Sequence, residues 1–218
     1  MMANNKEKTE AQFFEKSIKK SVFSEIKKQL VFFSVYPFSD EVSLSYKLAY
    51  EFLSSHPDRK LVWFSTDKTV KKTIEQFKSY GFGIEEHFGR IIFIDLVSKG
   101  VAVPKEQKGM KVFYIDDPDN LVEISMLLHD IFADQAVDIA VIDSINGLLA
   151  FNQMDHVLRF VRFLSVIAEE TNTAMLLEFF KGQFQPEIEF ALQIPCDIIL
   201  SVDGGKPVLK KSQETISL

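Results

Sequence analysis

Cysteine, glycine-rich loops and long apolar runs are scarce in this chain of 218 residues. The single cysteine, Cys196, excludes an intrachain disulfide, and a reducing cytoplasm is therefore the expected location. No apolar run approaches the roughly 20 residues of a transmembrane helix, and the polar N-terminus lacks the apolar core of a signal peptide. The histidines are scattered without metal-ligand spacing, so we expect neither a metal site nor a cofactor.

The composition describes a globular domain rather than a nucleic-acid binder. Apolar residues make up 46% of the chain and aromatic residues 12%, which is enough to build a large core. The formal net charge of −6 argues against general binding to nucleic acid, because such proteins are usually basic. Membrane binding is not expected either.

Short apolar runs alternate with helical periodicity along most of the chain. This pattern predicts an α/β fold: a three-layer αβα sandwich with a twisted, mostly parallel sheet of about seven to nine strands and antiparallel strands at its C-terminal edge. We expect a disordered tail over 1–8, followed by a single domain over 9–218. Its parts are an N-terminal amphipathic helix (9–29), a core (30–202) and a C-terminal hairpin (203–218). The expected core strands are 30–35, 61–64, 90–94, 111–115, 138–142, 173–179 and 197–202.

The expected N-terminal helix has an apolar stripe and a basic remainder. Phe14, Ile18, Val22 and Ile26 recur every four residues, and most of the lysines lie off that stripe. A basic amphipathic helix can bind a membrane or a partner, and it can equally pack on its own sheet. We favour the second interpretation.

The first expected strand leads into a turn with an unusual sequence. P-loop proteins carry G-x-x-x-x-G-K-[ST] at such a turn, and its backbone N–H groups bind phosphate. Here glycine positions hold Val35, Asp40 and, where a third glycine is frequent, Phe38, while Glu41 replaces the lysine and Val42 the hydroxyl residue. We interpret the segment as a degenerate P-loop made of Val35, Tyr36, Pro37, Phe38, Ser39, Asp40, Glu41 and Val42.

Three segments together resemble the RecA/KaiC-like P-loop ATPases. The first is the strand, turn and helix just described. The second, LVWFSTDKTV at 61–70, is similar to a strand ending in S-x-E-E, with Lys68 in place of the second acidic residue. The third, DIAVIDSINGL at 138–148, is similar to the Walker B strand, with Asp143 as its carboxylate. The chain also resembles a small archaeal family of uncharacterised proteins with a degraded P-loop.

The resemblance implies a RecA-like fold whose ATP chemistry has been lost. Two like charges about 4 Å apart repel by about 4 kcal/mol at an effective dielectric of 20, so an acidic turn disfavours a triphosphate. We therefore expect a non-catalytic pseudo-ATPase that binds a protein or peptide, with a homodimer left open because the parent families assemble. Two alternatives stay open: an atypical nucleotide-binding or metal-assisted hydrolase using Asp143, Asp67 and Glu178, and a recombination accessory protein that binds single-stranded DNA.

Acidic residues follow most of the expected strands. The carboxyl ends of parallel strands meet at one edge, where ligands bind in this fold class. This edge is a candidate binding site for a cation or a basic protein segment, although Asp40, Asp67 and Asp116 are also natural helix N-caps. The candidate acidic edge comprises Asp40, Glu41, Asp67, Asp95, Asp116, Asp143 and Glu178.

A phenylalanine-rich segment after the strand at 173–179 is a second candidate surface. Phe179, Phe180 and Phe184 are expected either to dock on a protein partner or to fold back on the core.

Overall fold

The computed structural model describes residues 29–98, 109–203, 206–211 and 214–215, with side chains up to Ser201. The expected tail and nearly all of the expected N-terminal helix lie outside these residues.

The strands form one mixed sheet in the order β4-β3-β2-β5-β6-β1-β7-β8-β9. Neighbours from β4 to β7 pair in parallel, whereas β8 pairs antiparallel with β7 and β9 antiparallel with β8. This arrangement confirms the predicted α/β class, the mostly parallel sheet and the antiparallel C-terminal edge. The strands are β1 (Leu30–Val35), β2 (Leu61–Ser65), β3 (Ile91–Asp95), β4 (Lys111–Tyr114), β5 (Ile139–Asp143), β6 (Ala174–Phe180), β7 (Ile198–Asp203), β8 (Lys206–Lys211) and β9 (Glu214–Thr215).

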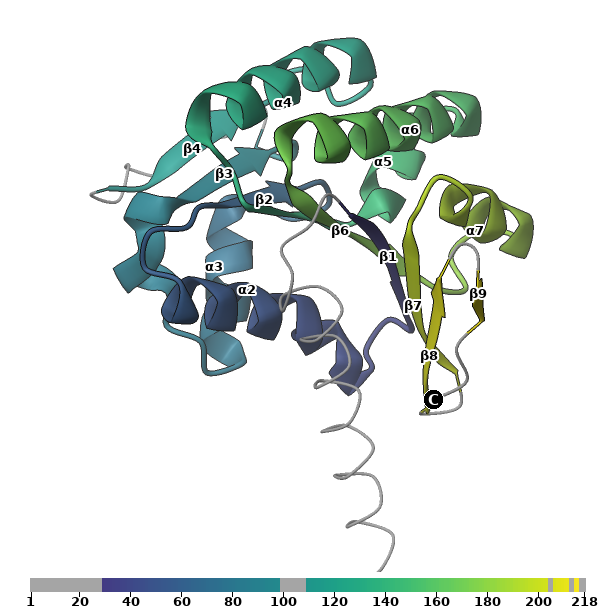
Figure 1. Cartoon of the computed structure of the whole chain (residues 1–218), viewed down its shortest axis with the longest axis horizontal. Coiled ribbons are helices and arrows are strands. Elements are labelled where there is room, and N and C mark those ends of the chain that lie inside the picture. The colour runs from purple at the N-terminus through teal and green to yellow at the C-terminus, as the bar shows by residue number, and fades with distance from the viewer. Residues whose placement is uncertain (1–28, 99–108, 204–205, 212–213, 216–218) are drawn as a thin grey trace, which may run out of the picture.

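Helices cover both faces of the sheet (Figure 1). One face packs against α2 (Ser43–Ser55) and α3 (Val70–Ser79), and the other against α4 (Leu121–Gln135), α5 (Ile145–Phe151), α6 (Met154–Thr171) and α7 (Pro186–Gln193). Two 3₁₀ segments, η2 (Asp40–Val42) and η3 (Ile84–Arg90), complete the described elements.

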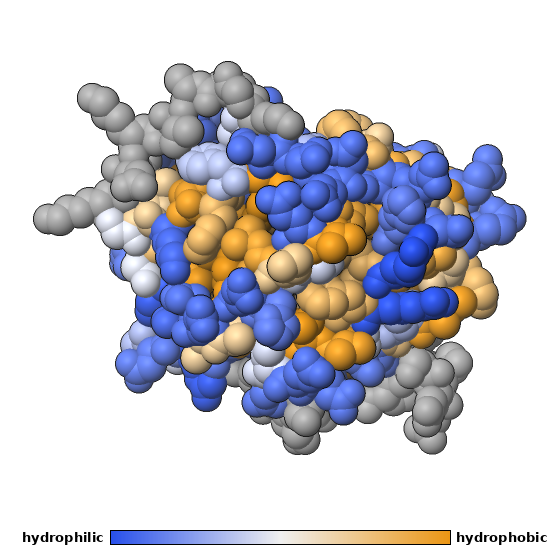
Figure 2. Space-filling view, turned by 90° about the horizontal axis from the view of Figure 1, so that it is seen from above, coloured by the Kyte–Doolittle hydropathy of each residue, from blue (hydrophilic) through white to orange (hydrophobic). Residues whose placement is uncertain are grey.

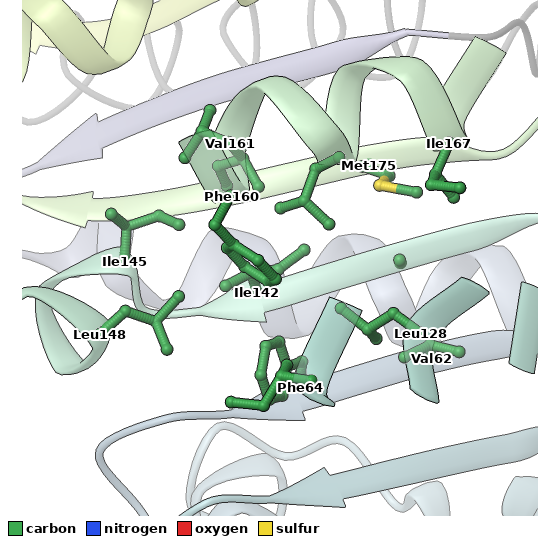
Figure 3. Packing of buried hydrophobic residues seen from close by; sticks show 14 of the residues in the cluster. Val62, Phe64, Leu128, Ile142, Ile145, Leu148, Phe160, Val161, Ile167 and Met175 are labelled. Atoms are coloured by element: carbon green, nitrogen blue, oxygen red, sulfur yellow. The ribbon is translucent and has the colours of Figure 1, made fainter. Parts of the chain in front are cut away.

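The central strands are apolar on both faces because both are buried. In β5, Ala140 and Ile142 join the core under α4 and α6, while Ile139 and Val141 join the core under α2 and α3. Figure 3 shows Ile142 close to Phe160 of α6. Alternation of this kind fixes the register, since a slip of one residue would exchange the two faces of a strand.

The outer surface of the α4–α6 layer is partly apolar, with hydrophobic side chains between charged ones (Figure 2). Val122 and Met126 of α4 and Val166 of α6 are more than half exposed. Among the described residues, no helix combines the length and the apolarity needed to cross a membrane.

Candidate functional site

The degenerate P-loop, the β2–α3 connection and the ends of β5 and β6 meet at the carboxyl edge of the sheet. Asp143, the last residue of β5, is completely buried on the face covered by α2 and α3. One of its oxygens, Oδ2, accepts a hydrogen bond of 2.8 Å from the Tyr46 hydroxyl. The other, Oδ1, lies 2.7 Å from the Lys68 ammonium. The Walker B-like carboxylate is therefore paired with side chains of its own chain.

Lys68, in the loop after β2, contacts several of the residues around Asp143. Its ammonium is 3.6 Å from Asp67 and 3.3 Å from the Tyr46 hydroxyl. It also lies 5.8 Å from the ring centroids of both Tyr46 and Phe180. Burial alone would lower the pKa of Lys68, but the neighbouring Asp143 and Asp67 charges outweigh it and the pKa is raised. The lysine is thus held in its charged form.

Glu178 adds a second buried carboxyl group beside Asp143. It is completely buried on β6, and Ser45 of α2 donates a hydrogen bond of 3.2 Å to its Oε1. Burial and the Asp143 charge raise its pKa well above the ordinary value, which favours the protonated form. The ammonium of Lys68 then balances the charge of Asp143, and Glu178 adds no further charge.

Hydrogen bonds hold the loops around this cluster in place. Thr66, after β2, accepts a bond of 2.9 Å from the Ser144 amide and donates one to the Ser144 carbonyl. Asn146 in α5 exchanges two bonds, of 2.8 and 2.9 Å, with the backbone of Phe180. The ends of β2, β5 and β6 are consequently fixed relative to one another.

An open pocket of about 720 Å³ lies over the cluster. Its floor is contributed by Tyr46 and Lys68, and one side by the degenerate P-loop. The lining residues are Pro37, Phe38, Ser39, Asp40, Val42, Ser43, Tyr46, Asp67, Lys68, Gln76, Tyr80, Phe180 and Gln183.

Two aromatic side chains of the degenerate P-loop are exposed at this pocket or beside it. Phe38 is fully exposed and has a φ of 67°, the left-handed conformation that glycine and asparagine adopt most easily. Tyr36 is 52% exposed, and its ring lies 5.3 Å from the Lys181 ammonium. A left-handed phenylalanine without burial costs free energy that the fold of this turn does not recover in packing.

The acidic edge is divided between two environments. Asp95, Asp143 and Glu178 are buried, and we call them the sealed carboxylates. Asp40, Asp67 and Asp116 are exposed to solvent, and we call them the open carboxylates. Glu41 is half-buried in η2. Of the seven residues of the candidate acidic edge, only Asp40, Asp67 and Asp116 are therefore exposed.

Asp95 illustrates how a sealed carboxylate is satisfied. It accepts hydrogen bonds of 2.8 to 2.9 Å from the amides of Val70, Val97 and Ser98, and one of 2.7 Å from the Ser98 hydroxyl. The bond from Val70 also anchors the first turn of α3. Asp95 is consequently unavailable to an external ligand.

The alternative that the open carboxylates are helix N-caps is wrong. Thr69, not Asp67, caps α3 by accepting a bond from the Lys72 amide, and Asn120, not Asp116, caps α4 through the Glu123 amide. Asp40 lies inside η2, whose N-cap is Ser39. The prediction from residue type named good capping residues, but the caps of α3 and α4 lie two and four residues further along the chain.

The phenylalanines of the second candidate surface fold back on the core. Phe179 and Phe180 belong to β6 and are 1% and 8% exposed. Phe184 is partly buried and packs on the core under α6. Of the two alternatives for this segment, burial of Phe179 and Phe180 agrees with the one in which they fold back on the core, and β6 ends at Phe180, one residue later than expected.

Tyr46, Gln76 and Tyr80 were not recognised from the sequence as site residues. Gln76 and Tyr80 lie four residues apart and face the pocket from α3 and its end. Their spacing was the only signal, and it does not differ from that of an ordinary helix surface. Among the residues described, no three His, Cys, Asp or Glu side chains are arranged to hold a metal ion.

No protein-family model and no curated protein matches the sequence. Several solved structures, however, are similar to this one in fold. A KaiC-like protein from the hyperthermophilic archaeon Pyrococcus horikoshii OT3 is 16% identical with a TM-score of 0.62, covering 88% of this chain and 83% of that one. The flagellar accessory protein FlaH from Methanocaldococcus jannaschii is 15% identical with a TM-score of 0.59, covering 89% and 83%.

A third similar structure is an uncharacterized Pyrococcus horikoshii protein in complex with an unknown peptide. It is 12% identical with a TM-score of 0.62, covering 89% of this chain and 86% of that one. Each likeness extends over nearly the whole chain, although the sequences have diverged widely. On the strength of these structures and of the sheet order, this chain has the RecA/KaiC-like fold.

Proposed function

We propose that this chain is a non-catalytic RecA/KaiC-like domain that binds a protein or peptide partner and does not hydrolyse ATP. The observation that carries the proposal is the pairing of Lys68 with Asp143 at 2.7 Å. In the parent fold the Walker B carboxylate serves a magnesium ion. Here both of its oxygens are occupied by Tyr46 and Lys68, and no part of the side chain faces solvent.

The residues of the degenerate P-loop and its surroundings do not fit magnesium and a nucleoside triphosphate. Val42 offers no hydroxyl to a metal, and the Ser43 hydroxyl is turned to the backbone carbonyl of Asp40 at 2.7 Å. Asp40 and Glu41 bring negative charge to the turn where phosphates would lie. Lys68 has both Asp143 and Asp67 within 3.6 Å, so its charge is already compensated.

A protein or peptide partner suits the pocket better than a nucleotide does. Exposed aromatic side chains such as Phe38 and Tyr36 are typical of protein-binding surfaces, where they are often the residues that contribute most to affinity. A neighbour with the same fold was crystallised with an unknown peptide, which is a ligand of this class. We also propose a cytoplasmic location, because the single cysteine requires no oxidising compartment.

Calorimetric titration of the purified chain with Mg-ATP tests the proposal. We expect no heat of binding and no rise in the free energy of unfolding, whereas a ligand at about 100 times its Kd would stabilise the fold by about 2.7 kcal/mol. An intact P-loop ATPase, titrated in parallel, is the positive control. Micromolar binding of Mg-ATP would overturn the proposal.

A further inference from the structure

We propose that the pocket over the degenerate P-loop binds an arginine or lysine side chain of a partner's peptide segment, with Phe38 as the apolar contact beside it. This inference rests on the proposed function and names the chemistry of its ligand. It is carried by three features of the described pocket: the charge on its rim, the aromatic rings on its floor and the exposure of Phe38.

The rim of the pocket keeps negative charge after the internal ion pair is counted. Asp40, Asp67 and Lys68 are its charged lining residues. Lys68 lies 2.7 Å from the buried Asp143 and 3.6 Å from Asp67, so these three groups together carry one net negative charge, and the exposed Asp40 adds another. Lys181 lies beside the pocket, where its ammonium is placed over the Tyr36 ring. The uncompensated charge of the lining therefore favours a cation over a phosphate.

The floor of the pocket already holds one cation against aromatic rings. The Lys68 ammonium lies 5.8 Å from the centroids of both Tyr46 and Phe180. Tyr80, which also lines the pocket, packs its ring edge-on against Tyr46 at 5.3 Å. Aromatic faces attract ammonium and guanidinium groups, and a planar guanidinium can stack on them while it pairs with a carboxylate. Tyr46 and Phe180 are buried, so the partly exposed Tyr80 is the ring that a ligand arginine paired with Asp67 would contact.

Phe38 supplies apolar surface that its own chain leaves uncovered. Its side chain is fully exposed, although the backbone at this position would suit glycine or asparagine better. The ring makes no contribution to the core, so a partner that covers it would gain apolar contact area without displacing any contact of the fold. Because it lines the pocket next to Asp40, an apolar residue adjacent to the ligand's basic residue would lie against it.

Fluorescence polarisation with three labelled peptides of equal length tests this inference. Each peptide has a glycine–serine background and carries Arg-Leu-Arg, Gln-Leu-Gln or Glu-Leu-Glu at its centre. We expect the arginine peptide to bind, with an affinity that falls as salt is added, and the glutamate peptide not to bind.

Two variants and two matched controls locate the binding. Asp67→Asn is expected to weaken binding of the arginine peptide about fivefold, and Phe38→Asn about tenfold. Phe38→Asn suits the left-handed backbone, so a loss of binding cannot be attributed to unfolding. Asp134→Asn on α4 and Phe190→Ser on α7 remove an exposed carboxylate and an exposed ring from elements on the other face of the sheet, and they should leave binding unchanged.

The outcomes separate this inference from the function on which it rests. A preference for the neutral or acidic peptide overturns it, as does failure of all three to bind. So does arginine binding that persists in both Asp67→Asn and Phe38→Asn. None of these results restores an ATP site, so a negative Mg-ATP titration leaves the non-catalytic function in place. Micromolar binding of Mg-ATP, by contrast, contradicts the proposed function itself.

Discussion

The sealed and open carboxylates lie at the same edge of one sheet, but they differ in what satisfies them. Asp95, Asp143 and Glu178 are at most 1% exposed, and each accepts at least one hydrogen bond from a donor of its own chain. One oxygen of Glu178, Oε2, is buried without a hydrogen-bond partner among the described residues. Asp67 retains 32% of its side-chain exposure, and Asp40 and Asp116 are also exposed. In the parent fold, the residues at these strand ends bind ligands. Here the carboxylates at some strand ends take part only in contacts within the fold, and those at other strand ends are accessible to solvent.

The difference teaches that position on the edge does not by itself make a carboxylate available. Burial requires compensation, because an unpaired charge in the interior is very costly. Asp143 is compensated by Lys68, and Asp95 by three backbone amides and a hydroxyl. The open carboxylates are accessible to solvent, although Asp67 also lies 3.6 Å from the Lys68 ammonium and accepts a hydrogen bond from the Ser144 hydroxyl. Only these accessible carboxylates can bind a ligand from outside the fold. Removing the internal donors should therefore damage the fold, whereas removing the open carboxylates should not.

The largest expected effect comes from Lys68→Met, which removes the cation that compensates Asp143. Breaking a buried ion pair from one side usually costs 3–5 kcal/mol, and we expect about 3 kcal/mol because Lys68 is partly exposed. Urea unfolding at neutral pH measures the loss. The double variant Lys68→Met/Asp143→Asn should recover most of it, since the uncompensated charge is then gone. If the two substitutions are additive, Lys68 does not compensate Asp143.

A smaller effect is expected from Asp95→Asn, with Asp116→Asn as its matched control. Asp95 accepts hydrogen bonds from backbone amides, and asparagine would turn an NH₂ group, which is a donor, toward some of these donors. The free energy of unfolding should therefore fall by about 2 kcal/mol. The same substitution at the exposed Asp116 should change it by less than about 0.5 kcal/mol. Equal losses at the two positions would contradict the division into sealed and open carboxylates.

The fold could be predicted because its signal repeats along the chain. Apolar runs such as Leu30–Val35 and Ile139–Asp143 are buried on both faces, and their alternation with helical patterns leaves few topologies. Helix starts were less predictable. Asp67 and Asp116 are good capping residues by type, but the turns after β2 and β4 place Thr69 and Asn120 at the caps instead.

The site could be predicted only where it depends on the strand order. That order brings the ends of β2, β5, β6 and β1 side by side, and Asp67, Asp143 and Glu178 lie at or just after three of these ends. Which of them is sealed depends on long-range contacts that no local pattern encodes. Tyr46 reaches Asp143 across 97 positions and Lys68 reaches it across 75. The exposure of Phe38 likewise depends on the geometry of the turn, which its sequence does not specify.

Glu178→Gln tests the sealed cluster through the pH dependence of stability. The folded state raises the pKa of Glu178, so it keeps a proton that the unfolded state releases above its ordinary pKa of about 4.3. The contribution of Glu178 to stability is therefore complete below that value and is lost as pH rises through the folded pKa.

Glutamine has the same shape as glutamate but carries no ionisable group. The variant should consequently be more stable than the wild type near pH 8, and the difference should shrink toward about pH 5 in urea unfolding. The matched control is Glu187→Gln on α7, which removes an exposed carboxyl group from an element on the other face of the sheet. A curve for Glu178→Gln parallel to that of the wild type would mean that this carboxyl group titrates in the folded protein as it does in the unfolded chain.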